Sequence, residues 1–244
     1  MRYDKIIDGD KLMEIIQQTD YKITLYRTGI IATTFMVVMI PVQIAFFLLW
    51  PHPTSIVDWF ALFNNNWIIG LISFDFLYML TMIASVFLYI ALFFALFDLK
   101  KSLSLFGLII GLIGLTIYFS SNTSLEMLAL SRQYLNATTE QERGLLIASG
   151  QTLYLIWKGT SYSVYYVLNG IALILFFLAM IKSTNFRKST SYIGLTAGLL
   201  MTVPATAGVL GMTMALLSLM PWSIFSILVI QDFNNMIKEI RTRK

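Results

Sequence analysis

One acidic residue, Asp75, lies inside a long apolar run. Three later residues, Lys158, Tyr162 and Tyr165, fall at or just beneath its expected depth, and Asn169 is expected nearer the middle of the membrane. A carboxylate near an ammonium group, hydroxyls and an amide could bind a cation, carry a proton or hold a small polar ligand. Structural roles compete with this hypothesis. Asp75 could pair with Lys158 or an aromatic hydroxyl, or lie at a helix end; the tyrosines could form an interfacial belt, and Asn169 an interhelical hydrogen bond. We favour the structural roles and keep the five residues as candidate ligand or ion contacts.

Residues for enzymatic chemistry are sparse. The chain has one histidine, His52, and no cysteine. His52 lies between two prolines without a nearby second metal ligand, so we expect a solvated loop residue. The sequence contains no phosphate-binding loop, GxSxG elbow, HExxH pair or dinucleotide fingerprint. We therefore predict no metal site, no cofactor and no catalytic residues.

The apolar runs that carry these residues indicate a membrane protein. Hydrophobic residues make up 57% of the 244 residues, charged residues 12%, and the mean hydropathy is +0.75. A bilayer core about 30 Å thick needs roughly 20 helical residues, and six runs approach or exceed that length. We predict an all-α, polytopic bundle of transmembrane helices. The predicted spans are 28–50, 67–97, 102–119, 161–181, 189–207 and 212–230.

The basic residues predict the orientation. Fourteen of the seventeen Lys and Arg residues lie in segment 1–27, in the turns after the second and fourth spans, and in segment 231–244. Basic residues gather on the cytoplasmic side, so both termini are predicted to be cytoplasmic. We assign the net charge of +4 to attraction by anionic lipid at that face rather than to nucleic-acid binding. Asp75 then lies about 33 Å from the cytoplasmic end of its span, near the outer interface.

A seventh span over Gly144–Trp157 is the main alternative. Fourteen helical residues cover only about 21 Å, and a seventh span would erase the charge asymmetry. We interpret this run as either an interfacial helix or an outward extension of the fourth span.

Three segments lie outside the predicted spans. Segment 1–27 is predicted to be a cytoplasmic amphipathic arm, with a short helix from Asp10 through Gln18 against the inner leaflet. Segment 120–160 is predicted to be an extracytoplasmic helical cap, with one helix over Ser124–Asn136. A second helix is expected to start at Thr139, because Glu142 completes a capping box. Segment 231–244 is predicted to be a basic cytoplasmic tail.

An internal repeat relates two of the spans. Residues 101–112 and 188–199 align without gaps and share seven of twelve residues, including Gly107 with Gly194 and Gly111 with Gly198. Both segments start at the cytoplasmic face, so the repeat is parallel, and three hairpins are a plausible architecture. Glycines four residues apart let helices approach closely. We expect these glycines to lie in seams within the chain rather than in a dimer interface.

Parts of the chain resemble a known family. Segments 122–134, 137–146 and 192–200 are similar to the multi-pass prokaryotic membrane family called domain of unknown function 4386, most clearly at Ala137-Thr138-Thr139-Glu140. The likeness covers most of the chain beyond the first span. It implies a multi-pass protein of a prokaryotic cytoplasmic membrane, and it brings no established reaction or ligand.

Two functions remain open at this stage. The first is a non-enzymatic membrane protein that acts through a protein partner, a second copy, lipid or sensing. The second is a carrier of a small solute or cation, with an outward-facing polar site around Asp75.

Overall fold

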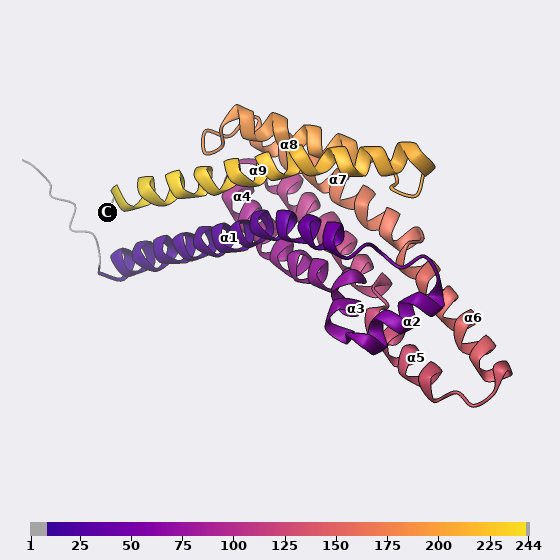
Figure 1. Ribbon diagram of the computed structural model, residues 1–244. Helices are drawn as coiled ribbons and strands as arrows, with labels where there is room; N and C mark the ends of the chain where they lie inside the picture. Colours follow the sequence, from indigo (N-terminus) through magenta and orange to yellow (C-terminus); the bar gives the residue numbers. More distant parts are fainter. Residues whose placement is uncertain (1–8, 243–244) are drawn as a thin grey trace, which may run out of the picture.

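A computed structural model describes residues 9–242, with side chains from residue 19 onward, and every element in this range is a helix (Figure 1). Four stretches of residues 19–242 are long and apolar enough to cross a membrane: Thr19–Leu49, Phe76–Asn136, Glu140–Met180 and Gly208–Thr242. The all-helical fold is thus confirmed, and the long apolar helices are compatible with the predicted membrane protein. The helices are α1 (Gly9–Leu49), α2 (Ile56–Asn65), α3 (Trp67–Ser73), α4 (Phe76–Ser121), α5 (Ser124–Asn136), α6 (Glu140–Trp157), α7 (Thr160–Met180), α8 (Lys188–Met201) and α9 (Gly208–Thr242).

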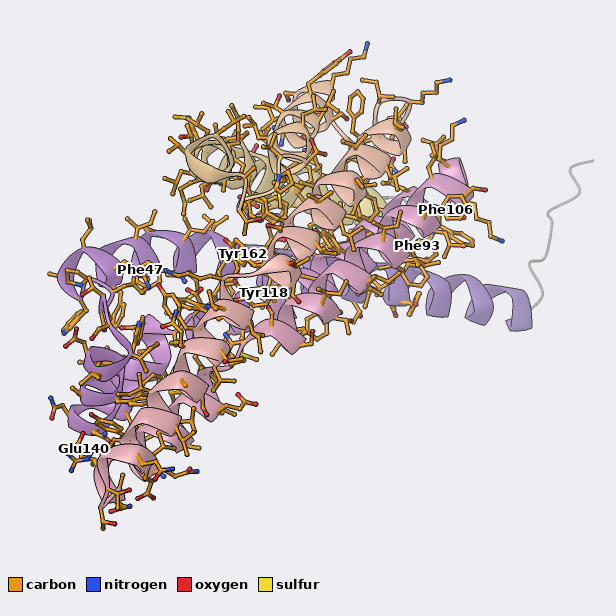
Figure 2. All side chains as sticks on the ribbon, turned by 90° about the vertical axis from the view of Figure 1, so that its right-hand side faces the viewer. Phe47, Phe93, Phe106, Tyr118, Glu140 and Tyr162 are labelled. Atoms are coloured by element: carbon orange, nitrogen blue, oxygen red, sulfur yellow. The ribbon has the colours of Figure 1, made fainter. Side chains whose placement is uncertain are left out.

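The helix α4 is bent back on itself. Lys100 interrupts it with φ −143° and ψ 62°, outside the helical region. The rings of Tyr78 and Tyr118 lie with centroids 5.3 Å apart, whereas a straight helix would separate these residues by about 60 Å. Figure 2 shows Phe93 and Phe106, which precede and follow the bend, at the same end of the molecule. The two halves of α4 therefore form a hairpin, which matches the predicted turn between the second and third spans.

A bundle of α1, both halves of α4, α7, α8 and α9 forms the larger part of the fold. The helix α4 packs on α1 and α7, α8 packs between α7 and α9, and α9 returns to α1. Leu88, Leu92, Phe176, Val229 and Phe233 are fully buried between them. Large apolar side chains also cover the outside, as expected of helices that face lipid.

The helices α2, α3, α5 and α6 form a smaller unit at the end of the bundle away from the C-terminus (Figure 1). Its aromatic core contains Trp59, Phe60, Phe63, Phe74 and Trp157. The helix α7 follows α6 after a break at Lys158 and Gly159, and Glu140, at the start of α6, lies at the far tip (Figure 2). Residues 144–157 therefore extend the span that follows them, which is one of the two interpretations of this run.

Two local predictions for this unit are confirmed. The helix α5 covers Ser124–Asn136, as predicted. Thr139 caps α6: its hydroxyl accepts the backbone N–H of Glu142 at 3.1 Å, and the Glu142 carboxylate accepts the N–H of Thr138. Short polar side chains at helix starts satisfy N–H groups that lack partners within the helix, which is why this start can be read from sequence.

Three predicted boundaries were wrong. The run 67–97 is broken at Phe74 and Asp75, so α3 is a separate helix and α4 begins at Phe76. The run 189–207 stops being helical at Met201, because Pro204 excludes a continuing helix. The short helix expected from Asp10 through Gln18 is the start of the uninterrupted α1; its side chains, and the basic residues of segments 1–8 and 243–244, lie outside the described residues.

The glycines of the repeat face other helices of the chain or, for Gly111, the first half of α4. A Cβ at Gly107 would lie 3.3 Å from the Phe176 ring, and one at Gly111 would lie 2.6 Å from the Tyr89 ring. A Cβ at Gly194 would meet the Phe225 ring at 2.8 Å. Gly198 faces backbone instead of a ring: the carbonyl oxygen of Gly170 in α7 lies 2.9 Å from a Cβ built at Gly198.

Two ion pairs tie the bundle together at the end that carries the C-terminus. Lys22 of α1 contacts Asp98, next to the bend of α4, at 3.1 Å. Arg187, just before α8, donates to the carboxylate of Asp232 in α9 at 2.6 Å, and Thr190 donates to the other carboxylate oxygen at 2.6 Å. Asp232 is 1% exposed. Arg187 also donates to the Gln231 side chain and the Leu228 carbonyl, so its three guanidinium nitrogens link the α7–α8 turn to three acceptor atoms of α9.

Candidate functional site

Asp75 lies at the junction of α3 and α4. Among the described residues, Asp75 is the one non-glycine residue with a left-handed backbone (φ 61°). Aspartate adopts this conformation more readily than most residues. Its side chain joins two other helices. Gln43 of α1 donates to Oδ1 at 3.4 Å, and the indole N–H of Trp157 donates to Oδ2 at 3.1 Å. Asp75 is thus a helix-end residue with two neutral hydrogen-bond donors.

The expected pairing of Asp75 with Lys158 or an aromatic hydroxyl was wrong. Lys158 Nζ instead donates to the Tyr154 hydroxyl at 2.8 Å and lies 4.9 Å from the centroids of the Tyr154 and Trp157 rings. Lys158 follows Trp157, the last residue of α6, and α7 starts at Thr160. Its ammonium group therefore covers the aromatic cluster from outside rather than neutralising Asp75 directly.

His52 is not the solvated loop residue that the sequence led us to expect. Its ring packs among Phe47, Trp59 and Trp157, with centroid distances of 4.7, 5.9 and 6.1 Å. Burial lowers the pKa of His52, the charge of Lys158 lowers this pKa further, and a hydrogen bond with the Ser73 backbone raises it. The net lowering favours the neutral imidazole at pH 7.

A cavity lies deeper in the bundle, one helical turn past Asp75. Its volume is about 40 Å³, enough for a few water molecules. The lining residues come from α1, α4, α7, α8 and α9, and none is charged. They are Met36, Ile40, Tyr78, Thr81, Met82, Ser85, Tyr89, Leu115, Tyr165, Tyr166, Asn169, Met201, Ser218, Leu219 and Trp222.

Hydrogen bonds between helices organise the polar wall of this cavity. The Tyr89 hydroxyl donates to Asn169 Oδ1 at 2.6 Å, which confirms the interhelical bond predicted for Asn169. The hydroxyls of Tyr78 and Tyr165 lie 2.9 Å apart. On the other side, Tyr166 donates to the Ala215 carbonyl at 2.9 Å and lies 2.6 Å from the Ser218 hydroxyl. Buried polar groups bonded in this way hold their positions, so the wall is preorganised.

The structure does not bring the five predicted site residues together: two line the cavity, two lie in the outer aromatic cluster, and Tyr162 lies in neither place. Tyr165 and Asn169 line the cavity. Asp75 and Lys158 belong to the outer aromatic cluster instead, on either side of Trp157. Tyr162 stacks on Tyr166 with centroids 6.0 Å apart and does not line the cavity; Figure 2 shows it beside Tyr118, midway between the two ends of the molecule.

Most of the cavity wall was not predicted from the sequence, above all Tyr78 and Tyr89. A signal was present. Tyr78, Thr81, Ser85 and Tyr89 are spaced by three or four residues, the spacing of one helix face. A polar stripe of this kind within an apolar span indicates a face turned towards other helices or a cavity.

Among the described residues, no three His, Asp or Glu side chains are grouped so as to hold a metal ion. The chain matches no protein-family model, no curated protein and no solved structure. The resemblance to domain of unknown function 4386 therefore stays a prediction, and the site must be interpreted from its own geometry.

Proposed function

We propose that the chain is a six-pass membrane protein of a prokaryotic cytoplasmic membrane, with both termini in the cytoplasm. The six passes would be α1, the two halves of α4, α7, α8 and α9. The helix α8 has only 14 residues, about 21 Å, so its pass would include the non-helical residues 202–207 that join it to α9. The hairpin at Lys100 supports this count, because it turns one long helical stretch into two passes. The basic residues near Lys100 and Arg187 and in α9 then share one face with the termini, and α2, α3, α5 and α6 form the extracytoplasmic cap.

Cysteine labelling tests this topology, because the native chain has no cysteine. In intact cells, a membrane-impermeant maleimide is expected to label Gln141→Cys, at the exposed start of α6, and not Lys101→Cys or Lys238→Cys. All three should react once the membrane is permeabilised, which controls for local accessibility. Labelling of Lys101→Cys in intact cells would contradict the proposed hairpin orientation.

For the activity, we propose that the protein binds a small uncharged molecule in its bundle and acts without catalysis, as a sensor or lipid-responsive protein. The cavity supports this proposal most strongly, since it combines neutral polar groups with apolar walls, the usual composition of ligand sites. A signal could pass to the cytoplasmic face because α4, α7 and α9 line the cavity and continue to that end.

Filling the cavity should abolish binding. Ser85 lines the cavity. Its hydroxyl donates to the Thr81 carbonyl of its own helix at 2.9 Å and has a long 3.7 Å contact with the Met36 sulfur of α1, so Ser85→Val adds volume while leaving no strong partner unsatisfied. Small uncharged ligands found by a thermal-shift screen of the native protein should lose their stabilising effect in Ser85→Val. The matched control is Ser191→Val, a buried serine that bonds its own helix at the Arg187 carbonyl and lies outside the cavity lining. An equal ligand shift in Ser85→Val and the native protein would reject the cavity as the site.

A small-solute carrier is the second candidate. It is favoured by the end of α8 at Met201, a cavity-lining residue, because carriers often place interrupted helices at their binding sites. Uptake of a ligand from the same screen into proteoliposomes, lost in Ser85→Val, would favour the carrier. Binding without uptake would favour the sensor.

A further inference from the structure

The cavity is closed towards the cap. Asp75 ties α1 and α6 to the start of α4 through Gln43 and Trp157. The Ser163 hydroxyl lies 2.7 Å from that of Thr206, which ties α7 to the turn before α9. The Tyr78–Tyr165 hydroxyl pair lies between these ties and the cavity. A polar solute arriving through the cap would have to break several of these contacts.

The cavity is also closed towards the opposite end of the bundle. Leu88, Leu92 and Val229 are each 0% exposed there. Beyond them, the rings of Tyr26 and Phe233 stack with centroids 5.4 Å apart, which joins α1 to α9. Tightly packed apolar side chains leave no aqueous path through this end.

The remaining exposure is on the side of the bundle, mainly between α1 and α9. Most lining residues are buried; the partly exposed ones are Ile40 of α1, Tyr78 of α4, and Leu219 and Trp222 of α9. The surface around them is strongly apolar: Val42 is 47% exposed and Met220 73%. Such a surface faces hydrocarbon in a membrane protein, so the side of the cavity opens towards lipid.

Prolines mark both edges of this opening. Pro41 follows Ile40 in α1, and Pro221 precedes Trp222 in α9. Each proline removes a backbone hydrogen bond from its helix and favours a local bend. Three methionines, Met36, Met82 and Met201, line the cavity behind the opening, and flexible methionine side chains can make room for a ligand.

The hydrogen-bonding groups of the wall define the head of the ligand. A single bond between the Tyr78 and Tyr165 hydroxyls uses one of their two protons, and Asn169 donates one of its two amide N–H groups to the Tyr165 carbonyl. One hydroxyl proton and one N–H therefore remain for a ligand oxygen. Without a charged lining residue, burial of an ionic head would be costly.

We propose that the ligand is a long-chain lipid with a small, uncharged head that carries a hydroxyl or carbonyl oxygen, and that it enters sideways from the bilayer between α1 and α9. The head occupies the cavity beside Tyr165 and Asn169, and the chain stays in lipid along Leu219 and Trp222. This inference rests on the proposed ligand-binding function and adds the ligand class and its route.

Photolabelling of the full-length protein in nanodiscs tests the inference. The probe is a hexadecanol that carries a diazirine near its hydroxyl. It should label cavity residues of α1, α7 or α9, as mapped by mass spectrometry. Excess hexadecanol should suppress this labelling, whereas hexadecyl phosphate and hexadecyltrimethylammonium should not. Leu219→Trp narrows the opening and should slow labelling several-fold. Leu217→Trp, on the lipid-facing side of the same helix, should leave the rate unchanged. Thermal unfolding confirms that both variants are folded.

The other outcomes separate this inference from the proposed function. Cavity labelling by a short, water-soluble diazirine alcohol but not by the long-chain probe would overturn lateral entry and leave ligand binding standing. Equal labelling rates in Leu219→Trp and Leu217→Trp would also overturn lateral entry. Competition by either charged analogue would overturn the uncharged head. Labelling of the cavity by neither probe would reject both this inference and the proposed function.

Discussion

Arg187→Ala is expected to destabilise the protein more than Asp232→Ala, although the two side chains form one ion pair. Asp232 is 1% exposed, while the side chain of Arg187 is 41% exposed. Removing Arg187 leaves a buried carboxylate with only Thr190 as a donor, and an uncompensated buried charge costs about 3–5 kcal/mol. Removing Asp232 leaves an arginine that can turn to water, so the loss should be smaller. Thermal unfolding in detergent measures both.

Two further variants separate the ion pair from general charge effects. Arg187→Ala combined with Asp232→Ala should be more stable than Arg187→Ala alone, because the stranded carboxylate is gone. Lys188→Ala removes the same charge from an exposed neighbouring position and should change stability little. Equal losses of stability from Arg187→Ala and Lys188→Ala would show that Arg187 stabilises the protein through its charge near the membrane and not through its pair with Asp232.

Much of the architecture was predictable because a bilayer constrains length and charge more strictly than water does. The apolar runs predicted where α1, α7 and α9 lie, and the basic residues at 100 and 101 marked the bend of α4. Breaks inside apolar runs were harder to predict. The end of α3 could not be read from the composition of 67–97, since the break depends on the left-handed backbone of Asp75 and on a hydrogen bond that Asp75 accepts from Trp157, which is distant in sequence.

The candidate site, like the fold, was predictable only in part. Depth counting placed Asp75, Tyr165 and Asn169 in the outer half of the bundle, but depth gives no rotation about a helix axis. The rotation of each helix about its axis determines which neighbours a side chain contacts. Asn169 faces Tyr89 and the cavity, whereas Asp75 is hydrogen-bonded to Trp157 in the outer aromatic cluster. The pairing of Arg187 with Asp232 was missed for a related reason. Arg187 was counted only as a basic residue near the membrane, although a buried aspartate at the same end of α9 was available to it.

Gly170→Ala is the second substitution with a large expected effect. A Cβ at Gly170 would lie 2.7 Å from the Gly198 carbonyl oxygen and 3.0 Å from the Met201 backbone carbon. Backbone atoms cannot rotate aside, so α7 and α8 must separate along this crossing. Overpacking of this kind typically costs about 1–3 kcal/mol, and the loss of close interhelical contacts adds to it. Thermal unfolding of the purified variant should show the loss.

The size of the effect should follow the type of atom that each glycine faces. Gly107 faces the Phe176 ring at 3.3 Å, and a side chain can yield, so Gly107→Ala should cost less than Gly170→Ala. Gly144 has nothing within 4 Å of a built Cβ, so Gly144→Ala should be neutral or slightly stabilising through helix propensity. Equal losses at Gly170 and Gly144 would contradict the close crossing. Because Met201 lines the cavity and Gly170 follows Asn169, Gly170→Ala should also weaken ligand binding, whereas Gly144→Ala should not.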